Sequence, residues 1–255
     1  MKGILIDISG TLVTSNGVAR STINAINKLK LKGIPFRICS NASKESHNKV
    51  ISDLSTKLDG IDLNPNHVIT AISSSKSYVT HSNLNPLLLL SNSAKDDFKD
   101  YSSDKTDYDS VLIGLSAESL NYPNLNNAFR ILNQPGSQLI ATHASKYFAD
   151  KDNQLSLGPG GFVKALEYVT DKKAIICGKP SDEFFISCLK SLNLRESDWK
   201  DVAIIGDDAL SDLGTSLPLR KVLVRTGKYR RGDEDKVKDL YGIYDTFADF
   251  VDSID

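Results

Sequence analysis

Short apolar runs alternate along the chain with longer segments in which apolar residues recur every three or four positions. The run GILIDI (3–8) precedes RSTINAINKLKLKG (20–33), where Ile23, Ile26 and Leu29 form one apolar stripe and Gly33 ends the helix. Alternation of strand-length and helix-length segments is typical of parallel β-α-β units. The N-terminal part therefore predicts an α/β fold.

The same alternation continues after residue 33 and returns near the C-terminus. Strands are expected in IPFRICSN (34–41), KAIICGKP (173–180), DVAIIGDD (201–208) and RKVLVRTG (220–227). The segment SKESHNKVISDLSTKLDG (43–60) predicts a helix that carries Val50, Ile51, Leu54 and Leu58 on one face. A further helix from about Pro180 presents Phe184, Phe185, Cys188, Leu189 and Leu192 on one face. In between, PLLLLS (86–91), SVLIGL (110–115), YPNLNNAFRILN (122–133) and QLIATH (138–143) predict additional strands and a helix, which favours an inserted unit.

Composition and charge exclude several classes of function. The 255 residues carry 31 basic and 32 acidic side chains, so no overall field favours nucleic acid or an anionic membrane. The apolar run at 85–91 is far too short to span a bilayer, and no signal-peptide core precedes Asp7. We expect a cytoplasmic protein, with the nucleus as an alternative, that binds neither nucleic acid nor membrane.

The three cysteines lie in apolar segments without the spacing of metal ligands. An odd number cannot all pair within one chain, so we interpret Cys39, Cys177 and Cys188 as reduced core residues.

Polar and charged residues gather where four of the apolar runs end. In open parallel sheets, ligands bind beyond the carboxyl ends of the strands. Phosphoryl transfer needs a carboxylate that attacks phosphorus, a second carboxylate for magnesium, an ammonium and further hydrogen-bond donors. Each short motif by itself is compatible with an ordinary turn, but the set supplies all of these groups. Its members are Asp7, Ser9, Ser40, Asn41, Lys179, Asp207, Asp208 and Asp212.

The motifs DISGTL, SNASKES, GKPSDEFF and IIGDD, in this order, resemble those of the haloacid dehalogenase (HAD) superfamily. LGPGGFVKALEY and RTGKYR extend the likeness over nearly the whole chain. The resemblance implies a Rossmann-like parallel-sheet core in residues 1–73 and 174–255. It also implies an inserted α/β cap domain of type 2 in residues 74–173.

The resemblance further implies a magnesium-dependent hydrolase with an aspartyl-phosphate intermediate. Asp7 would attack phosphorus, and Lys179 would offset charge on the nucleophile and on the bound phosphate. Mg2+ would be held by Asp7, the backbone carbonyl of Ser9 and Asp207. Ser9 would also border the substrate.

The remaining motif residues would bind phosphate or orient the metal's ligands. Ser40 and the backbone after it, at Asn41 and Ala42, would hold the phosphoryl oxygens. Asp208 and Asp212 are expected to orient the ligands of the metal rather than bind it directly.

Ser9 departs from the commonest superfamily pattern, which has an aspartate two residues after the nucleophile. That aspartate protonates the leaving group, a contribution worth about 10² to 10⁴ in rate that a serine does not supply near pH 7. One resolution is a substrate whose leaving group needs little help, such as pyrophosphate, phosphohistidine or phospholysine. The alternative is a weak or inactive phosphate-binding scaffold. A receiver-type domain is disfavoured because its acidic pair precedes the phosphorylated aspartate.

The inserted segment is expected to select the substrate, a small phosphorylated molecule, and related caps pair two chains into a homodimer. Within THASKYFADKDN (142–153), His143 and Lys146 are either substrate contacts or ordinary exposed loop residues. The GPGG segment (158–161) lacks the ending of a P-loop, so it predicts a glycine turn that opens a helix.

Overall fold

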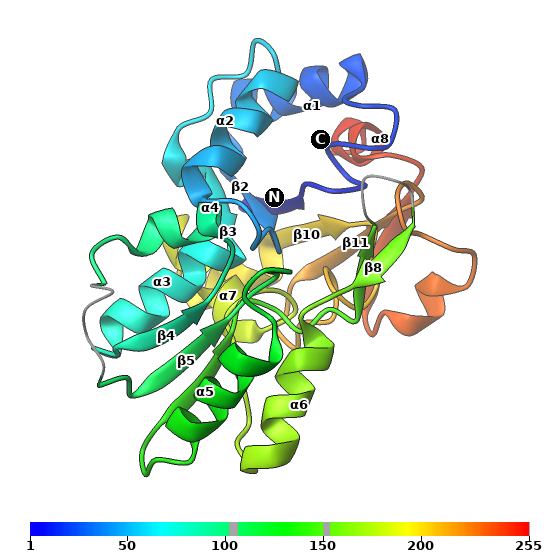
Figure 1. Cartoon of the computed structure of the whole chain (residues 1–255). Helices are drawn as coiled ribbons and strands as arrows, with labels where there is room; N and C mark the ends of the chain where they lie inside the picture. Colours follow the sequence, from blue (N-terminus) through cyan, green and yellow to red (C-terminus); the bar gives the residue numbers. More distant parts are fainter. Residues whose placement is uncertain (102–106, 150–153, 255) are drawn as a thin grey trace. The chain divides into compact units, whose positions relative to one another are not determined.

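The computed structural model describes residues 1–101, 107–149 and 154–254, and the chain forms two compact units (Figure 1). The first unit consists of Met1–Ser40, Asn48–Ile69 and Lys179–Asp255, and the second of Asn41–His47 and Thr70–Gly178.

A six-stranded sheet forms the centre of the first unit. The pairings between β1 and its neighbours β2 and β10, and from β10 through β11 to β12, are all parallel. Parallel pairing brings the carboxyl ends of these strands to one edge of the sheet. In spatial order the strands are β12 (Leu240–Tyr244), β11 (Arg220–Val224), β10 (Val202–Gly206), β1 (Gly3–Asp7), β2 (Phe36–Ser40) and β3 (Val68–Thr70).

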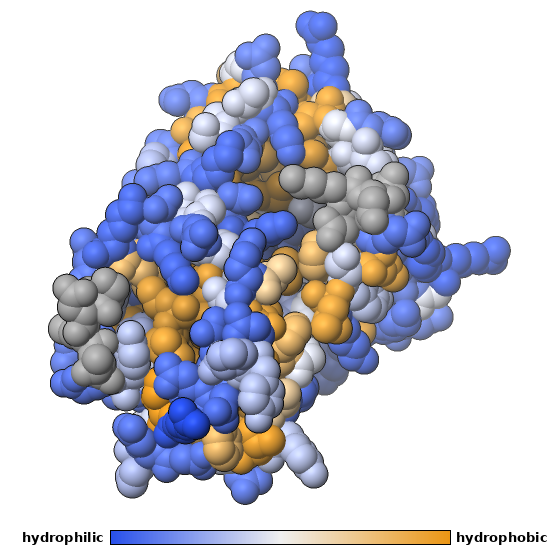
Figure 2. Space-filling model, in the orientation of Figure 1, coloured by the Kyte–Doolittle hydropathy of each residue, from blue (hydrophilic) through white to orange (hydrophobic). Residues whose placement is uncertain are grey.

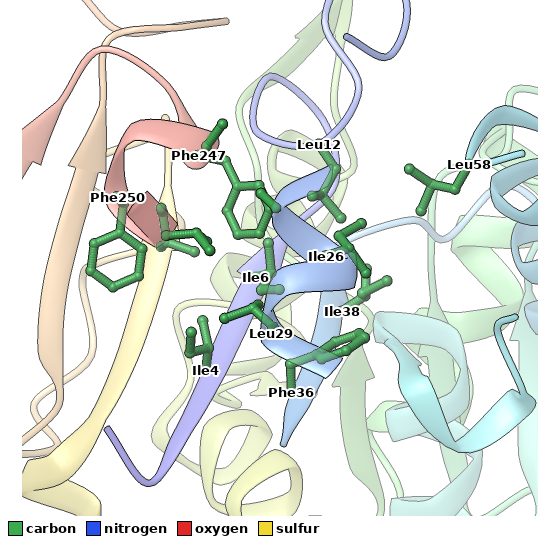
Figure 3. Packing of buried hydrophobic residues seen from close by; sticks show 14 of the residues in the cluster. Ile4, Ile6, Leu12, Ile26, Leu29, Phe36, Ile38, Leu58, Phe247 and Phe250 are labelled. Carbon is green, nitrogen blue, oxygen red and sulfur yellow. The ribbon is translucent and has the colours of Figure 1, made fainter. Parts of the chain in front are cut away.

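Helices cover both faces of this sheet because successive strand residues point to opposite sides. Ile4 and Ile6 pack in one apolar cluster together with Phe247 and Phe250 (Figure 3), whereas Leu5 packs in the other. The first cluster takes in α1 (Arg20–Leu31), α2 (His47–Lys57) and α8 (Phe247–Asp252), and the second takes in α7 (Asp182–Ser191). Three short 3-10 helices complete the unit: η1 (Pro65–His67), η3 (Glu196–Asp201) and η4 (Asp233–Lys236).

The second unit is built on a parallel sheet of its own. Its strands, in spatial order, are β4 (Pro86–Leu89), β5 (Ser110–Ile113), β6 (Gln138–Ala141) and β9 (Ile175–Ile176). Val111 and Ile113 pack against one face and Leu112 against the other, so this sheet is also covered on both sides. The helical elements are α3 (Ala71–His81), α4 (Asn92–Lys95), η2 (Asp96–Phe98), α5 (Tyr122–Leu132) and α6 (Gly160–Thr170), and an antiparallel hairpin pairs β7 (Tyr147–Ala149) with β8 (Leu155–Leu157).

The α/β class and the parallel sheet expected from the sequence are confirmed. The apolar side chains expected on α7 are all buried. The sequence patterns did not predict the strands β3, β7, β8 and β12 or the helices α3, α4 and α8.

The second unit consists of Thr70–Gly178 together with the separate segment Asn41–His47. The backbone N–H of Ser46 donates to Ser93 Oγ (3.1 Å), and that of His47 donates to Asp97 Oδ2 (2.7 Å). These two hydrogen bonds tie the segment that follows β2 to the α4 and η2 region.

All three cysteines are buried, as expected of core residues, and none of them forms a disulfide. Cys39 Sγ lies 3.6 Å from Cys188 Sγ. Among the described residues, no helix combines the length and the apolar character needed to cross a bilayer. The face drawn in Figure 2 is mostly hydrophilic, with apolar areas between the polar ones.

Candidate active site

Three adjacent strands bring polar residues together at one edge of the first sheet. Asp7 is the last residue of β1, Ser40 is the last of β2, and Asp207 directly follows β10. Because β1 pairs in parallel with both neighbours, these residues end their strands at the same edge. Both Asp7 and Ser40 are buried.

The buried ammonium of Lys179 lies between two carboxylates. Its Nζ donates to Asp7 Oδ1 at 2.5 Å and to Asp212 Oδ1 at 2.6 Å. A third hydrogen bond, of 3.2 Å, goes to the backbone oxygen of Cys39. An ammonium has three donors, which is enough for these three contacts. Although burial lowers it, the neighbouring Asp212 and Asp7 carboxylates raise the pKa of Lys179 above its ordinary value.

Asp7, Asp207 and Asp212 form a buried cluster whose ligand atoms lie within 4.8 Å of one another. Burial, followed by the repulsion from Asp212, raises the pKa of Asp7 from 3.8 to about 7. The same two causes raise the pKa of Asp207 to about 6. Clustered carboxylate oxygens are the ligands that a hard divalent cation such as Mg2+ prefers, and such a cation would relieve their mutual repulsion. The cluster therefore fits a magnesium ion.

Two glycines make room for the Asp207 carboxylate. Gly10 has φ +92° and Gly227 has φ +55°, and a Cβ at either position would overlap the carboxylate of Asp207. The backbone N–H of Lys228 donates to Asp207 Oδ2 at 2.6 Å, and Thr226 Oγ1 donates to the carbonyl of Gly10. The loops after β1 and β11 thus hold Asp207 from two sides.

Asp208 and Asp212 take different positions. Asp208 Oδ1 accepts the N–H groups of Leu210 (3.1 Å) and Ser211 (2.9 Å), and its Oδ2 lies 3.2 Å from Lys228 Nζ. Although burial raises it, the Ser211 N–H and the Lys228 ammonium hold the pKa of Asp208 below its ordinary value. Asp212 instead joins the buried cluster, and its Oδ2 accepts the backbone N–H of Asp208 at 3.1 Å.

The other sequence-predicted residues are divided between the two units. Ser9 is exposed and pairs by a β-bridge with Val13. Asn41 and Ala42 follow Ser40 directly and belong to the second unit. The sequence patterns did not predict that Thr226, Gly227 and Lys228 belong to the site, although the motif RTGKYR contains all three.

His143 is buried. Of the two interpretations of this residue, a substrate contact or an exposed loop residue, the second is therefore wrong. Its Nε2 lies 3.0 Å from Ser43 Oγ and its Nδ1 lies 3.1 Å from Ser145 Oγ. Lys146 is exposed, as that interpretation expected, and residues 150–153 of the expected contact segment lie outside the described part of the chain.

The GPGG segment forms a turn that opens α6, as expected. Gly158 N–H donates to the carbonyl of Lys146 (2.9 Å), and Gly160 N–H donates to that of Ser145 (3.0 Å). A Cβ at Gly158 or Gly160 would overlap the backbone of this segment, so both positions require glycine.

Comparison with known proteins defines the family. The model of the haloacid dehalogenase-like hydrolases matches residues 4–103, and a second HAD-like hydrolase model matches residues 176–250. Haloacid dehalogenase-like hydrolase domain-containing protein 2 of Bos taurus is 36% identical over 257 residues, which cover 100% of this chain and 96% of the relative. Phospholysine phosphohistidine inorganic pyrophosphate phosphatase of Xenopus laevis is 34% identical, over 92% of this chain and 87% of the relative. The chain belongs to the haloacid dehalogenase-like hydrolase family.

Solved structures share the fold over the full length. The 4-nitrophenylphosphatase of Thermotoga maritima superposes with a TM-score of 0.87 at 20% identity, covering 100% of this chain and 98% of that one. The p-nitrophenyl phosphatase of Archaeoglobus fulgidus gives the same TM-score at 22% identity, covering 99% of each chain.

Proposed function

We propose that this protein is a magnesium-dependent phosphatase that acts through an aspartyl-phosphate on Asp7. The observation that carries the proposal is the buried cluster of Asp7, Asp207 and Asp212, two of which, Asp7 and Asp212, pair with the ammonium of Lys179. The names of its relatives support the proposal, since they include a phosphatase of phospholysine, phosphohistidine and pyrophosphate, and two nitrophenylphosphatases.

In this proposal Mg2+ would be held by Asp7, Asp207 and the backbone carbonyl of Ser9. Asp212, whose carboxylate lies in the same cluster, either completes the set or orients it together with Asp208. When bound, the cation neutralises charge on the phosphoryl oxygens. The two glycines that make room for Asp207 favour such a role for its carboxylate.

The chain's own groups would carry out the transfer as follows. A carboxylate oxygen of Asp7 attacks phosphorus and forms the acyl-phosphate bond, while the bond from phosphorus to the leaving group breaks. Lys179, fixed by Asp212 at 2.6 Å, offsets the negative charge on the nucleophile and the phosphoryl oxygens. Ser40 and the backbone at Asn41 and Ala42 bind the remaining oxygens. Water then hydrolyses the acyl-phosphate.

Ser9 limits the substrates that this site would serve. An exposed serine hydroxyl is not acidic enough to protonate an alkoxide leaving group near pH 7. The favoured substrates are therefore small molecules with better leaving groups, either pyrophosphate or a phosphoramidate such as phosphohistidine or phospholysine. Replacing Ser9 by Asp is expected to raise turnover of an alkyl phosphate by about 10²-fold or more, with a smaller gain on pyrophosphate.

We assign the role of cap, which selects the substrate, to the second unit, with the insertion placed over residues 74–173. Lys146 is the exposed candidate for a substrate contact in this unit, and His143 would act through the residues to which it is hydrogen-bonded. Pairing of two chains through this unit would give a homodimer, which analytical ultracentrifugation tests directly.

The decisive experiment measures phosphate release from pyrophosphate, a phosphoramidate, phosphohistidine and p-nitrophenyl phosphate, with and without magnesium. Replacing Asp7 by Asn removes the nucleophile and is expected to lower turnover by about 10⁴-fold or more. Asp201→Asn is the matched control, because Asp201 pairs with Arg220 at 2.6 Å outside the cluster. Turnover that persists in Asp7→Asn contradicts the mechanism.

A phosphate-binding scaffold is the second candidate, favoured by the serine at position 9. It predicts that the folded wild-type protein binds magnesium and phosphate but releases no phosphate from any of the four substrates. Calorimetric titration with magnesium and with inorganic phosphate, run beside the turnover assay, separates the two functions.

A further inference from the structure

Lys228 contacts the acidic edge through both its backbone and its side chain. Its N–H donates to Asp207 Oδ2 at 2.6 Å, and its Nζ lies 3.2 Å from Asp208 Oδ2. The backbone contact fixes where the residue sits beside the buried cluster. The ammonium is therefore held near the carboxylates, although it belongs to a loop after β11.

Two ion-paired groups lie along the edge, and one backbone hydrogen bond connects them. In the interior, Lys179 pairs with Asp7 and Asp212, and toward the surface Asp208 pairs with Lys228. The backbone N–H of Asp208 donates to Asp212 Oδ2 and joins the two into one network. The exposed fraction of the side chain rises from 3% at Lys179 to 27% at Asp208 and 57% at Lys228. Lys228 is thus the cation at the solvent end of this network.

The Asp208 carboxylate has hydrogen-bond partners besides Lys228. Two backbone N–H groups, of Leu210 and Ser211, already donate to its Oδ1. An ammonium carries three donors, and the contact with Asp208 needs one of them. A lysine side chain in an exposed position is an ammonium at neutral pH.

We infer that Lys228 binds the anionic leaving portion of the substrate, so that the site prefers a diphosphate to an ester whose leaving portion is uncharged. The inference rests on the proposed phosphatase function and narrows its substrate class. The substrate's reacting phosphoryl group must approach Asp7 at the buried end of the network. A second phosphate attached to it extends toward solvent, where the network ends in the ammonium of Lys228.

This assignment also accounts for a serine at position 9. When Asp7 forms its bond to phosphorus, the bond from phosphorus to the bridging oxygen breaks, and its electron pair leaves on the departing phosphate. Lys228 keeps its proton and offsets this charge by a charge-assisted hydrogen bond. No proton has to be donated by residue 9.

The test compares the wild type with Lys228→Met, Lys228→Arg and the control Lys236→Met, on pyrophosphate and on p-nitrophenyl phosphate. Lys236 belongs to the same loop region but pairs with Asp233, at 2.6 Å. In Lys228→Met we expect KM for pyrophosphate to rise about tenfold or more, and to rise much less for p-nitrophenyl phosphate. Lys228→Arg should restore most of the loss, and Lys236→Met should leave the ratio of the two KM values unchanged.

Magnesium titration excludes a merely structural explanation. Lys228→Met keeps the backbone N–H on Asp207 and removes a positive charge, so magnesium should bind as tightly as in the wild type or more tightly. Weaker magnesium binding, or an equal loss on both substrates, would mean that Lys228 only shapes the metal cluster, and it would overturn the inference.

A binding measurement keeps the inference separate from the proposed function. In the Asp7→Asn background, calorimetry with magnesium pyrophosphate should show about tenfold weaker binding when Lys228 is also replaced by Met. If the wild type releases no phosphate but this difference is found, the phosphatase proposal fails and the diphosphate site stands. If binding does not depend on Lys228, the inference fails, whatever the turnover.

Discussion

The two units contain parallel sheets of similar construction, but the residues at their carboxyl edges differ. In both sheets, alternate strand residues pack in apolar clusters on opposite faces. The first sheet ends in Asp7, Ser40 and Asp207. The strands of the second sheet are followed by Leu90, Gly114, Thr142 and Cys177. The layered fold thus provides an edge for a site, and the side chains at the strand ends decide whether charge gathers there.

The electrostatic consequence is a difference in what holds each edge together. At the first edge, three buried carboxylates are balanced by the buried ammonium of Lys179. At the second, buried polar groups such as Thr142 and His143 carry hydroxyl and imidazole functions. The first edge should therefore respond strongly to charge removal, pH and magnesium, and the second weakly.

Removal of the central cation should have the largest effect on stability. Lys179→Met leaves buried carboxylates without their partner, so we expect the free energy of unfolding to fall by about 3–5 kcal/mol at pH 7.5 without magnesium. Lys49→Met breaks an exposed pair with Asp53 and should cost less than about 1 kcal/mol. Urea unfolding of both variants checks this, and equal losses would remove the distinction between the two kinds of ion pair.

The pH dependence of stability should be nearly as large. The pKa of Asp7 is raised from 3.8 to about 7, so between these values the folded state binds more protons than the unfolded state. The contribution of Asp7 to the free energy of unfolding is therefore largest below about pH 4. It falls by roughly 3–4 kcal/mol as the pH rises toward 7. Asp207, with a pKa of about 6, acts in the same direction.

Urea unfolding from pH 4.5 to 7.5 should show a smaller loss for Asp7→Asn than for the wild type. Magnesium should stabilise the wild type at pH 7.5 and have little effect at pH 4.5, where these carboxyl groups are protonated. Identical pH profiles for the wild type and the variant would show that folding does not raise the pKa of Asp7.

Crowding of the acidic edge can be tested with two glycines of similar backbone conformation. Gly10 has φ +92° and faces the Asp207 carboxylate, whereas Gly17 has φ +85° and nothing lies within 4 Å of its Cβ position. Gly10→Ala should cost about 1–3 kcal/mol and weaken magnesium binding, because Asp207 must move. Gly17→Ala should cost about 1 kcal/mol and leave magnesium binding intact. Thermal unfolding with and without magnesium distinguishes them.

The smallest effect is expected at the second edge. Among the described residues, none offers a hydrogen-bond partner to the buried hydroxyl of Thr142. Replacement by Val should leave the free energy of unfolding unchanged or raise it by about 1 kcal/mol. The stabilisation by magnesium should be that of the wild type. A loss of stability would mean that the hydroxyl has a bound partner such as water.

The sequence predicted the strands with long apolar runs and the helices with a clear apolar stripe. Burial of one or both faces of such an element imposes a periodic pattern of apolar residues, which is visible in the sequence. It did not predict the β7–β8 hairpin or β12. The side chains of Leu155, Leu157 and Tyr241 are largely exposed there, so burial leaves no period in the sequence. Segment 41–47 packs with the second unit through hydrogen bonds to residues that are distant in the sequence. A local sequence pattern does not predict such bonds.

The order of the chemical groups along the chain was a property of the sequence alone. Asp7, Ser40 and Asp207 follow apolar runs that form neighbouring parallel strands, and such strands carry their ends to one edge. Lys179 follows β9, a strand of the second sheet, so the sequence order alone did not place its ammonium beside Asp7. Only the tertiary structure decided that Asp212 lies beside Asp7 and that Lys228 lies beside Asp208. Both depend on the paths of loops, where distances between charges are set by three-dimensional packing and leave no periodic trace in the sequence.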